Sequence, residues 1–295
     1  WWGDILFTYA LCGILVLFVR DAPWRPLLIG SVLVYVLWHL VPFLGLLPEL
    51  AMEDRVRAGM ASGPEAKQYA DWLAAVSTYA DEETAAISGS FLHHAHVRWS
   101  NDALDPLLSA WNALGEVFPL MIWGVLMARS GFFAGAWPDR ALRKIGVWCA
   151  AAGLALTLAA LSWVWPRGFP LHTMETLILF GMAVPHALMA MGYAALLVLA
   201  TPRLAATGPG RNLMACGRMA FSNYIGTSLI MTALFYGWGL GLAGRYGHAA
   251  LWLFVVLGWV SMLAASTLWL ARFRRGPLEW AWRSLVEMRF LPQRR

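Results

Sequence analysis

Long apolar runs recur along almost the whole chain, and their length constrains the fold more than any other feature of the sequence. A helix needs about 20 apolar residues to cross the roughly 30 Å hydrocarbon layer of a bilayer. Only 13% of the residues are charged, against roughly 25% in an average soluble domain. The sequence therefore predicts an all-α, polytopic transmembrane helical bundle in one membrane domain, 1–295. About seven spans are expected, near residues 3–19, 26–47, 106–128, 145–165, 174–199, 219–241 and 249–271.

The distribution of Lys and Arg predicts the orientation of these spans. Loops on one side carry 16 of the 22 basic residues, and loops on the other side carry 6. Because basic residues collect on the cytoplasmic side of membrane proteins, Trp1 is expected outside and Arg295 in the cytoplasm. The lipid bilayer is then the main partner. The net charge of +5 follows from this topology and does not indicate nucleic-acid binding, because the basic residues are dispersed over short loops.

Two segments outside the spans have helical patterns of their own. Residues 48–105 form a long polar stretch with ten acidic and four basic residues, which favours an extracytoplasmic loop. Tyr69, Trp72 and Val76 recur there at helical spacing, so one or two surface helices are expected. Residues 276–290 place apolar side chains among charges, which predicts a cytoplasmic amphipathic helix at the membrane interface.

Cysteine and histidine spacing does not favour a metal or redox site. The three cysteines lie far apart and are expected to be packing residues: Cys12, Cys149 and Cys216. A group of three histidines has a spacing that could bind a metal ion, but no carboxylate accompanies it, so no metal site is predicted: His93, His94 and His96. The chain begins at Trp1 within an apolar run, and further sequence is expected before it.

Ionisable side chains at bilayer depth are the first functional candidates, because placing a charge there costs at least about 2.5 kcal/mol. Four are interpreted as catalytic candidates: Asp4, His39, Glu116 and His186. Glu116 lies roughly 15 Å into its span, a depth suited to proton transfer. His186 follows Pro185, whose missing amide hydrogen loosens the helix. His39, Glu116 and His186 each have an alternative role in helix packing. Asp4 can instead be an ordinary interfacial acid.

Other polar residues are interpreted as substrate-binding candidates: Asn112, His172, Glu175, Asn223 and Tyr224. His172, Glu175 and His186 are separated by three and eleven residues, so a continuous helix would place all three on one face. Asn223 and Tyr224 belong to a run of small polar residues in the predicted sixth span. Hydrogen bonds between helices explain such a run equally well.

Three segments together resemble a known family. They are GDILFTYALCG from Gly3, GRMAFSNYIGTSLIMTALFYGWGLGL from Gly217 and RFRRGPLEWAWRSL from Arg272. In this order they resemble the YeiB-like bacterial membrane proteins, the family of domain of unknown function number 418, over essentially the whole chain. The resemblance implies the bacterial cytoplasmic membrane and a distant relation to membrane acyltransferases, which move an acyl group from a cytoplasmic donor to an acceptor outside. It also implies a His shortly before the GDIL motif, which would precede Trp1.

Acyl transfer is the function expected first. It requires a general base and a cationic entrance for a phosphorylated donor such as acetyl-CoA or another acyl-CoA. Five cytoplasmic cations are candidates for the donor phosphates: Arg140, Arg143, Lys144, Arg211 and Arg218. The acceptor would be a small molecule or a glycan outside. The alternatives are a transporter or flippase with a buried Glu/His proton relay, which no internal repeat supports, and a non-catalytic sensor or scaffold that binds a partner through residues 48–105. No oligomeric state is predicted.

Overall fold

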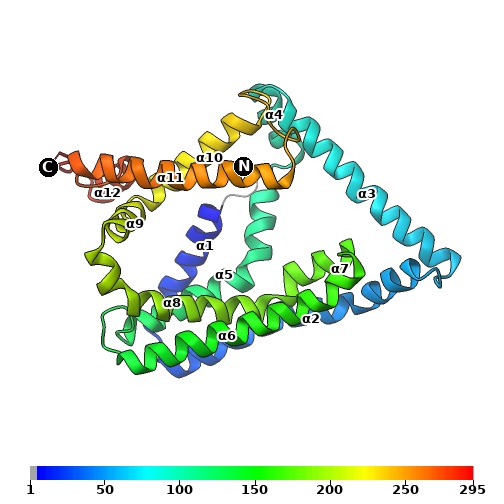
Figure 1. Cartoon of the computed structure of the whole chain (residues 1–295), viewed down its shortest axis with the longest axis horizontal. Coiled ribbons are helices and arrows are strands. Elements are labelled where there is room, and N and C mark those ends of the chain that lie inside the picture. Colours follow the sequence, from blue (N-terminus) through cyan, green and yellow to red (C-terminus); the bar gives the residue numbers. More distant parts are fainter. Residues whose placement is uncertain (1–4, 295) are drawn as a thin grey trace. The chain divides into compact units, whose positions relative to one another are not determined.

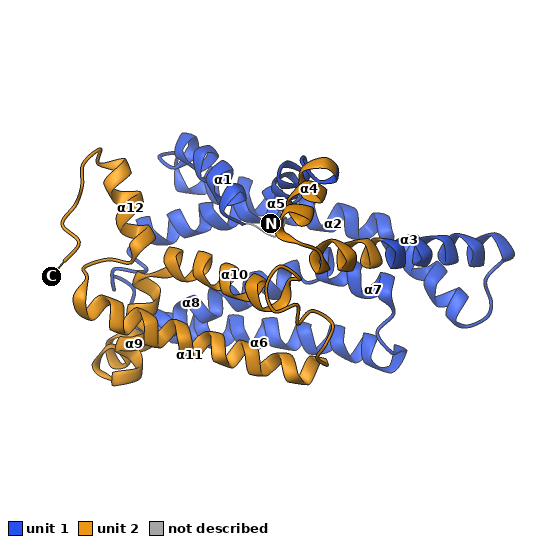
Figure 2. Ribbon diagram, turned by 90° about the horizontal axis from the view of Figure 1, so that it is seen from above, with its two compact units in different colours: residues 1–78, 101–199 blue, residues 79–100, 200–295 orange. Residues whose placement is uncertain are grey.

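The chain forms helices almost throughout. The computed structural model describes residues 5–294, in which the regular elements are helices and one isolated antiparallel bridge joins Phe273 to Arg294. The all-α class predicted from the apolar runs is confirmed. Figure 2 shows two compact units, of which unit 1 comprises Trp1–Thr78 with Asn101–Leu199, and unit 2 comprises Tyr79–Ser100 with Ala200–Arg295.

Unit 1 is built on long helices that pack closely along one another. α5 lies along both α1 and α2. α6 and α8 run side by side (Figure 1), and Gly192 permits this approach because a Cβ atom there would lie only 2.7 Å from Ala150 N. The elements of unit 1 are α1 (Ile5–Val19), α2 (Trp24–Arg57), the start of α3 (Gly63–Ser88), α5 (Asp105–Arg129), α6 (Asp139–Val164), the 3-10 turn η1 (Trp165–Arg167), α7 (Leu171–Thr176), the π-helical turn η2 (Leu177–Gly181) and most of α8 (Ala183–Ala206).

α2 continues well beyond the predicted span. The segment 48–105 is expected to begin as a loop at Pro48, but α2 passes this proline and ends at Arg57. Leu50 and Glu53 are buried in the additional turns, and α2 packs there against α7. This packing offsets the helix hydrogen bond that proline removes, which is why a local helix-breaking signal does not end the helix.

The span predicted over 174–199 is not one continuous helix. α7 gives way to the π-helical turn η2, Leu177–Gly181, and only then does α8 begin. A π-helical turn holds more residues than an α-helical turn, so side chains on its two sides lose their common register. His172 is buried, whereas Glu175 and His186 are exposed. His172 and Glu175 both lie in α7, and the π-helical turn separates them from His186 in α8, so the one continuous helix on which the shared face was predicted does not form here.

Unit 2 contains the end of α3, α4 (Phe91–Asn101), α9 (Gly208–Arg218), α10 (Ala220–Phe235), α11 (His248–Arg272) and α12 (Pro277–Val286). α10 is shorter than the predicted span 219–241, because the glycine-rich segment after Phe235 folds into turns. Gly237 N in these turns donates a hydrogen bond to Ile87 O at the end of α3 (2.8 Å). Backbone contacts therefore fasten this loop to α3.

The outer surfaces of the long helices suit hydrocarbon and not water. Within residues 5–294, five helices are long and apolar enough to cross a membrane, and α1 and α10 are shorter apolar helices. Large apolar side chains on them are exposed, such as Leu33 at 54% and Leu253 at 72%. In water such surfaces favour association, whereas lipid chains accommodate them. The chain is a multi-pass membrane protein; the count of seven spans and the orientation stay predictions.

Candidate functional site

Glu53 in α2 is the centre of a buried polar cluster in unit 1. Its side chain is 0% exposed. Oε1 accepts hydrogen bonds from Tyr69 Oη (2.9 Å) and His172 N (3.0 Å), and Oε2 accepts from Thr173 N (2.9 Å) and Thr173 Oγ1 (2.6 Å). All four partners are donors, as an ionised carboxylate requires. Two of them are backbone N–H groups in the first turn of α7, so Glu53 caps that helix and joins it to α2 and α3.

His172 is held beside Glu53 but contacts a second carboxylate. Its Nε2 lies 2.8 Å from Glu49 Oε2, at an angle outside hydrogen-bond geometry. The ring of Trp72 meets the imidazole edge-on, with centroids 4.6 Å apart. The Glu49 side chain is 44% exposed, so solvent reaches the pair from that side. The predicted substrate-binding residue His172 thus has its position fixed by α2, α3 and α7.

Two further contacts join the end of α2 to the 3-10 turn η1. Arg167 Nη2 lies 2.5 Å from Asp54 Oδ2, and Arg57 Nη2 donates a hydrogen bond to Arg167 O. Burial and the hydrogen bond to the Glu53 carboxylate raise the pKa of Tyr69 to about 12. Tyr69 consequently remains a protonated donor over the physiological pH range.

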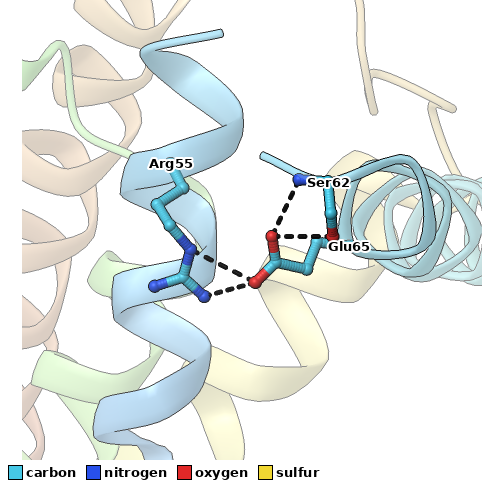
Figure 3. A network of polar contacts seen from close by, with 3 residues as sticks. All are labelled: Arg55, Ser62 and Glu65. Carbon is cyan, nitrogen blue, oxygen red and sulfur yellow. Dashed lines mark hydrogen bonds and ion pairs between the residues drawn. The ribbon is translucent and has the colours of Figure 1, made fainter. Parts of the chain in front are cut away.

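An exposed ion pair fixes the turn between α2 and α3. Figure 3 shows the guanidinium of Arg55 facing Glu65, with Arg55 Nη2 2.6 Å from Glu65 Oε1. Ser62 N and Ser62 Oγ donate to Glu65 Oε2 at 2.9 and 3.0 Å. The hydrogen bond from Arg55, followed by those from Ser62, lowers the pKa of Glu65 to about 2. Glu65 is therefore ionised at neutral pH, and the pair helps to position Tyr69 one turn further along α3.

His39 lies in the middle of α2 and lines a small cavity of about 220 Å³. Its Nδ1 lies 2.7 Å from Tyr35 O, a carbonyl that can only accept, so Nδ1 carries the proton and Nε2 is the basic nitrogen. The Tyr35 hydroxyl donates to Ala183 O (2.8 Å) and fastens α2 to the start of α8. Phe180 and Gly181 of the π-helical turn form another wall. The catalytic candidate His39 is thus a buried base with an adjacent cavity.

The other catalytic candidates are less enclosed. Glu116 in α5 is half-buried and lies within electrostatic range of Tyr35. Asn112, one turn earlier in α5, is exposed, and its backbone O accepts a hydrogen bond from Trp38 Nε1 (3.1 Å). His186 is exposed on α8. Asp4 lies outside the described residues. The structure therefore brings Glu116 towards Tyr35 and does not enclose His186.

A cationic cavity, open to the surface and lined by residues of α6 with the acid Asp139 among them, lies at the start of this helix. It has a volume of about 660 Å³, and its lining includes three of the cations predicted to bind phosphate, Arg140, Arg143 and Lys144. Trp148, one turn after Lys144, adds an exposed indole to the same lining. Sequence reasoning missed Trp148, although its i, i+4 spacing from Lys144 would have indicated it. Basic side chains beside an aromatic surface can hold a phosphorylated nucleotide.

The two remaining phosphate candidates belong to unit 2 and support its backbone. Arg211 Nη1 donates to Ala206 O (3.1 Å), next to the start of α9. Arg218 Nη2 donates to Arg274 O (3.0 Å), beyond the end of α11. These hydrogen bonds give both arginines a structural role.

Comparisons with known proteins assign the chain to a family. The model of the family described as "Protein of unknown function (DUF418)" matches residues 127–289, more than half of the sequence. The chain belongs to the DUF418 family. Two relatives are similar over nearly its whole length. "Uncharacterized protein YeiB" of Escherichia coli strain K12 is 29% identical over 97% of this chain and 70% of the relative, and "Uncharacterized protein YxaH" of Bacillus subtilis strain 168 is 28% identical over 99% of this chain and 68% of the relative. No solved structure matches the chain.

Two motifs in the DUF418 segment contact each other directly. Ser222 N, in the first turn of α10, donates to Glu279 Oε1 (3.0 Å), and Ser222 Oγ donates to Glu279 Oε2 (2.5 Å). In return Leu278 N, in the first turn of α12, donates to Ser222 Oγ (3.1 Å). Each helix therefore satisfies an unpaired N–H group of the other. Gly276 is required beside them, because a Cβ there would lie 2.0 Å from Glu279 Oε2.

We expect the Ser222→Ala substitution to lower the free energy of unfolding by about 1–3 kcal/mol, because it leaves Leu278 N and one carboxylate oxygen of Glu279 without this partner. Unfolding in a denaturing detergent, followed by circular dichroism, measures the change. Ser228→Ala is the matched control, since Ser228 Oγ donates to Tyr224 O of its own helix (3.1 Å). Equal losses in the two variants would contradict a reciprocal cap.

Asn223, in the sixth predicted span, has hydrogen-bond partners on neighbouring helices. Asn223 Nδ2 donates to Cys216 O (3.1 Å) and Ser266 Oγ (2.9 Å), and Ser266 is fully buried in α11. Tyr224 O accepts the hydrogen bond from Ser228. Asn223 also lines an apolar cavity of about 310 Å³ between α10 and α11. The contacts of Asn223 join α10 to α9 and α11, whereas the hydrogen bond between Ser228 and Tyr224 lies within α10.

Proposed function

We propose that this DUF418 protein transfers an acyl group from a cytoplasmic acyl-CoA to an acceptor on the other side of the bacterial cytoplasmic membrane. The observation that carries the proposal is the cavity at the start of α6, where Arg140, Arg143 and Lys144 lie with Trp148. Three cations suit the phosphates of coenzyme A, and an exposed indole offers a stacking surface for its adenine. In the predicted orientation this cavity faces the cytoplasm, where acyl-CoA is found.

His39 has the properties that the chemical step needs. Its Nε2 is basic because Nδ1 donates to Tyr35 O, and its cavity leaves room for a small reacting group. His39 Nε2 takes the proton of the acceptor hydroxyl or amine as the acceptor forms its bond to the acyl carbon. The bond between acyl carbon and sulfur then breaks, and the thiolate of coenzyme A receives the proton. α6 has 26 residues and is therefore roughly 39 Å long. This length is enough to cross the bilayer that separates the acyl donor from the acceptor.

The proposal is tested by calorimetric binding of acetyl-CoA to the purified protein in lipid nanodiscs. The charge-reversed double variant Arg143→Glu, Lys144→Glu is expected to abolish binding, and Trp148→Ala is expected to weaken it about tenfold through lost stacking. The control Arg283→Glu, Arg289→Glu changes the net charge equally, on α12 and in the segment that follows it, and is expected to bind as the unaltered protein does. Glu116→Gln is also expected to bind normally. Absence of binding to a folded protein would refute the acyl-CoA proposal.

A proton-linked transporter is the second candidate, and the π-helical turn η2 favours it. Transporters place interrupted helices at their binding sites, and Phe180 and Gly181 of η2 line the His39 cavity. If acetyl-CoA does not bind, solute uptake driven by a pH gradient in proteoliposomes becomes the informative measurement, with His39→Gln as the variant that should abolish it.

A further inference from the structure

A large apolar cavity lies in unit 1 close in sequence to the cationic one. Its volume is about 700 Å³, within the roughly 300–1,000 Å³ of typical ligand sites. The lining includes three indoles, Trp24, Trp123 and Trp137, with Leu28 and Leu126 among the aliphatic residues. In the predicted topology the surrounding helix ends lie on the cytoplasmic side. Apolar walls of this size suit a hydrocarbon chain.

The walls of this cavity are fixed by hydrogen bonds. Trp137 Nε1 donates to Ser130 O and Ser130 Oγ, both at 3.2 Å. Arg129 Nη1 donates to Arg20 O (3.0 Å) and Ala22 O (2.9 Å), which ties the end of α5 to the loop between α1 and α2. Trp137 is therefore held in place without a ligand, and the cavity is largely formed in advance.

The two cavities share one short stretch of chain. Trp137 lines the apolar cavity, Asp139 lines the cationic one, and only Pro138 separates them. A ligand that fits both needs a phosphorylated head and an apolar tail. Long-chain acyl-CoA has this composition, whereas acetyl-CoA would leave the apolar cavity unfilled.

We infer that the acyl donor carries a medium or long hydrocarbon chain, which occupies the cavity lined by Trp24, Trp123 and Trp137. This inference rests on the proposed function, because the chain is held through its coenzyme A head on α6. It adds the substrate class, which is a fatty acyl-CoA. The product is an acceptor that carries a fatty acyl group in ester or amide linkage. Each methylene group of the acyl chain that is fully buried lowers the dissociation constant by about fourfold.

The experiment compares the affinities of coenzyme A, acetyl-CoA and octanoyl-CoA for the full chain in nanodiscs, with empty nanodiscs as the blank for partition into lipid. Octanoyl-CoA is expected to bind at least about tenfold more tightly than acetyl-CoA. Leu28→Trp, which fills the cavity, is expected to remove this preference and leave coenzyme A binding unchanged. Leu33→Trp is the matched control, because Leu33 is an exposed leucine of the same helix that does not line the cavity.

Each outcome separates the inference from the proposed function. Equal affinity for acetyl-CoA and octanoyl-CoA would overturn the inference and leave acyl-CoA binding standing. A preference for octanoyl-CoA that survives in Leu28→Trp would also overturn it, since the chain would then lie elsewhere, in the bilayer for example. No binding of any of the three ligands would overturn both.

Discussion

Replacement of His39 by glutamine is expected to slow acyl transfer by about 10²–10⁴-fold, the usual contribution of a general base. Glutamine can still donate a hydrogen bond to Tyr35 O, so α2 keeps its local contact, but it cannot accept the proton of the acceptor. Binding of acetyl-CoA is expected to be unchanged, because the cationic cavity on α6 is untouched. The measurement is the release of coenzyme A thiol from acetyl-CoA by the protein in membrane vesicles, together with label transferred from the acyl group.

His186→Gln is the matched control for this prediction. His186 is exposed on α8 and does not line the His39 cavity, so its replacement is expected to change the rate less than about threefold. A large loss in His186→Gln with normal turnover in His39→Gln would show that the base lies on α8. An equal loss of acetyl-CoA binding and turnover in His39→Gln would show that His39 serves structure and not proton transfer.

Replacement of Glu53 by alanine is expected to lower the free energy of unfolding by about 3–5 kcal/mol. The substitution removes the acceptor for Tyr69 Oη, two backbone N–H groups of α7 and Thr173 Oγ1, and it leaves these donors in a buried place. The end of α2 and the start of α7 are expected to separate first. Thermal unfolding in nanodiscs, with limited proteolysis between residues 165 and 171, measures both effects.

Glu82→Ala provides the control for Glu53, because Glu82 is an exposed acid of α3. It is expected to change stability by less than about 0.5 kcal/mol. Glu53→Gln tests the negative charge separately. The glutamine amide keeps one acceptor oxygen, but its NH₂ group then faces hydrogen-bond donors that the second carboxylate oxygen of Glu53 accepts from. A glutamine variant as stable as the unaltered protein would show that Glu53 fills space and does not act as an anionic cap.

The sequence predicted the helical class and the approximate positions of the apolar helices, because hydrophobic length is a local property. It also placed His39 and Glu116 among the buried polar groups. Glu53 was assigned only to a polar loop, since its significance depends on Thr173, which lies 120 positions away in the chain. No periodicity or local motif connects such a pair.

The interruption after α7 was equally hidden from the sequence. Residues 174–199 are predominantly apolar, and a π-helical turn changes register without requiring a glycine or a proline at a fixed place. Trp148 was overlooked for another reason: an aromatic residue in a membrane helix is expected at the interface whether or not it binds anything. Trp148 becomes a candidate binding residue only because it lies beside Arg143 and Lys144 in the structure.

The reciprocal cap between Ser222 and Glu279 has a consequence for biosynthesis. These residues are 57 positions apart, and a ribosome that adds about 5–20 residues per second needs roughly 3–11 s to cover that distance. During this interval the first turn of α10 has entered the translocation machinery but lacks the carboxylate that completes it. The nascent chain therefore keeps an unfinished end of α10 until Glu279 and the first turn of α12 have been synthesised.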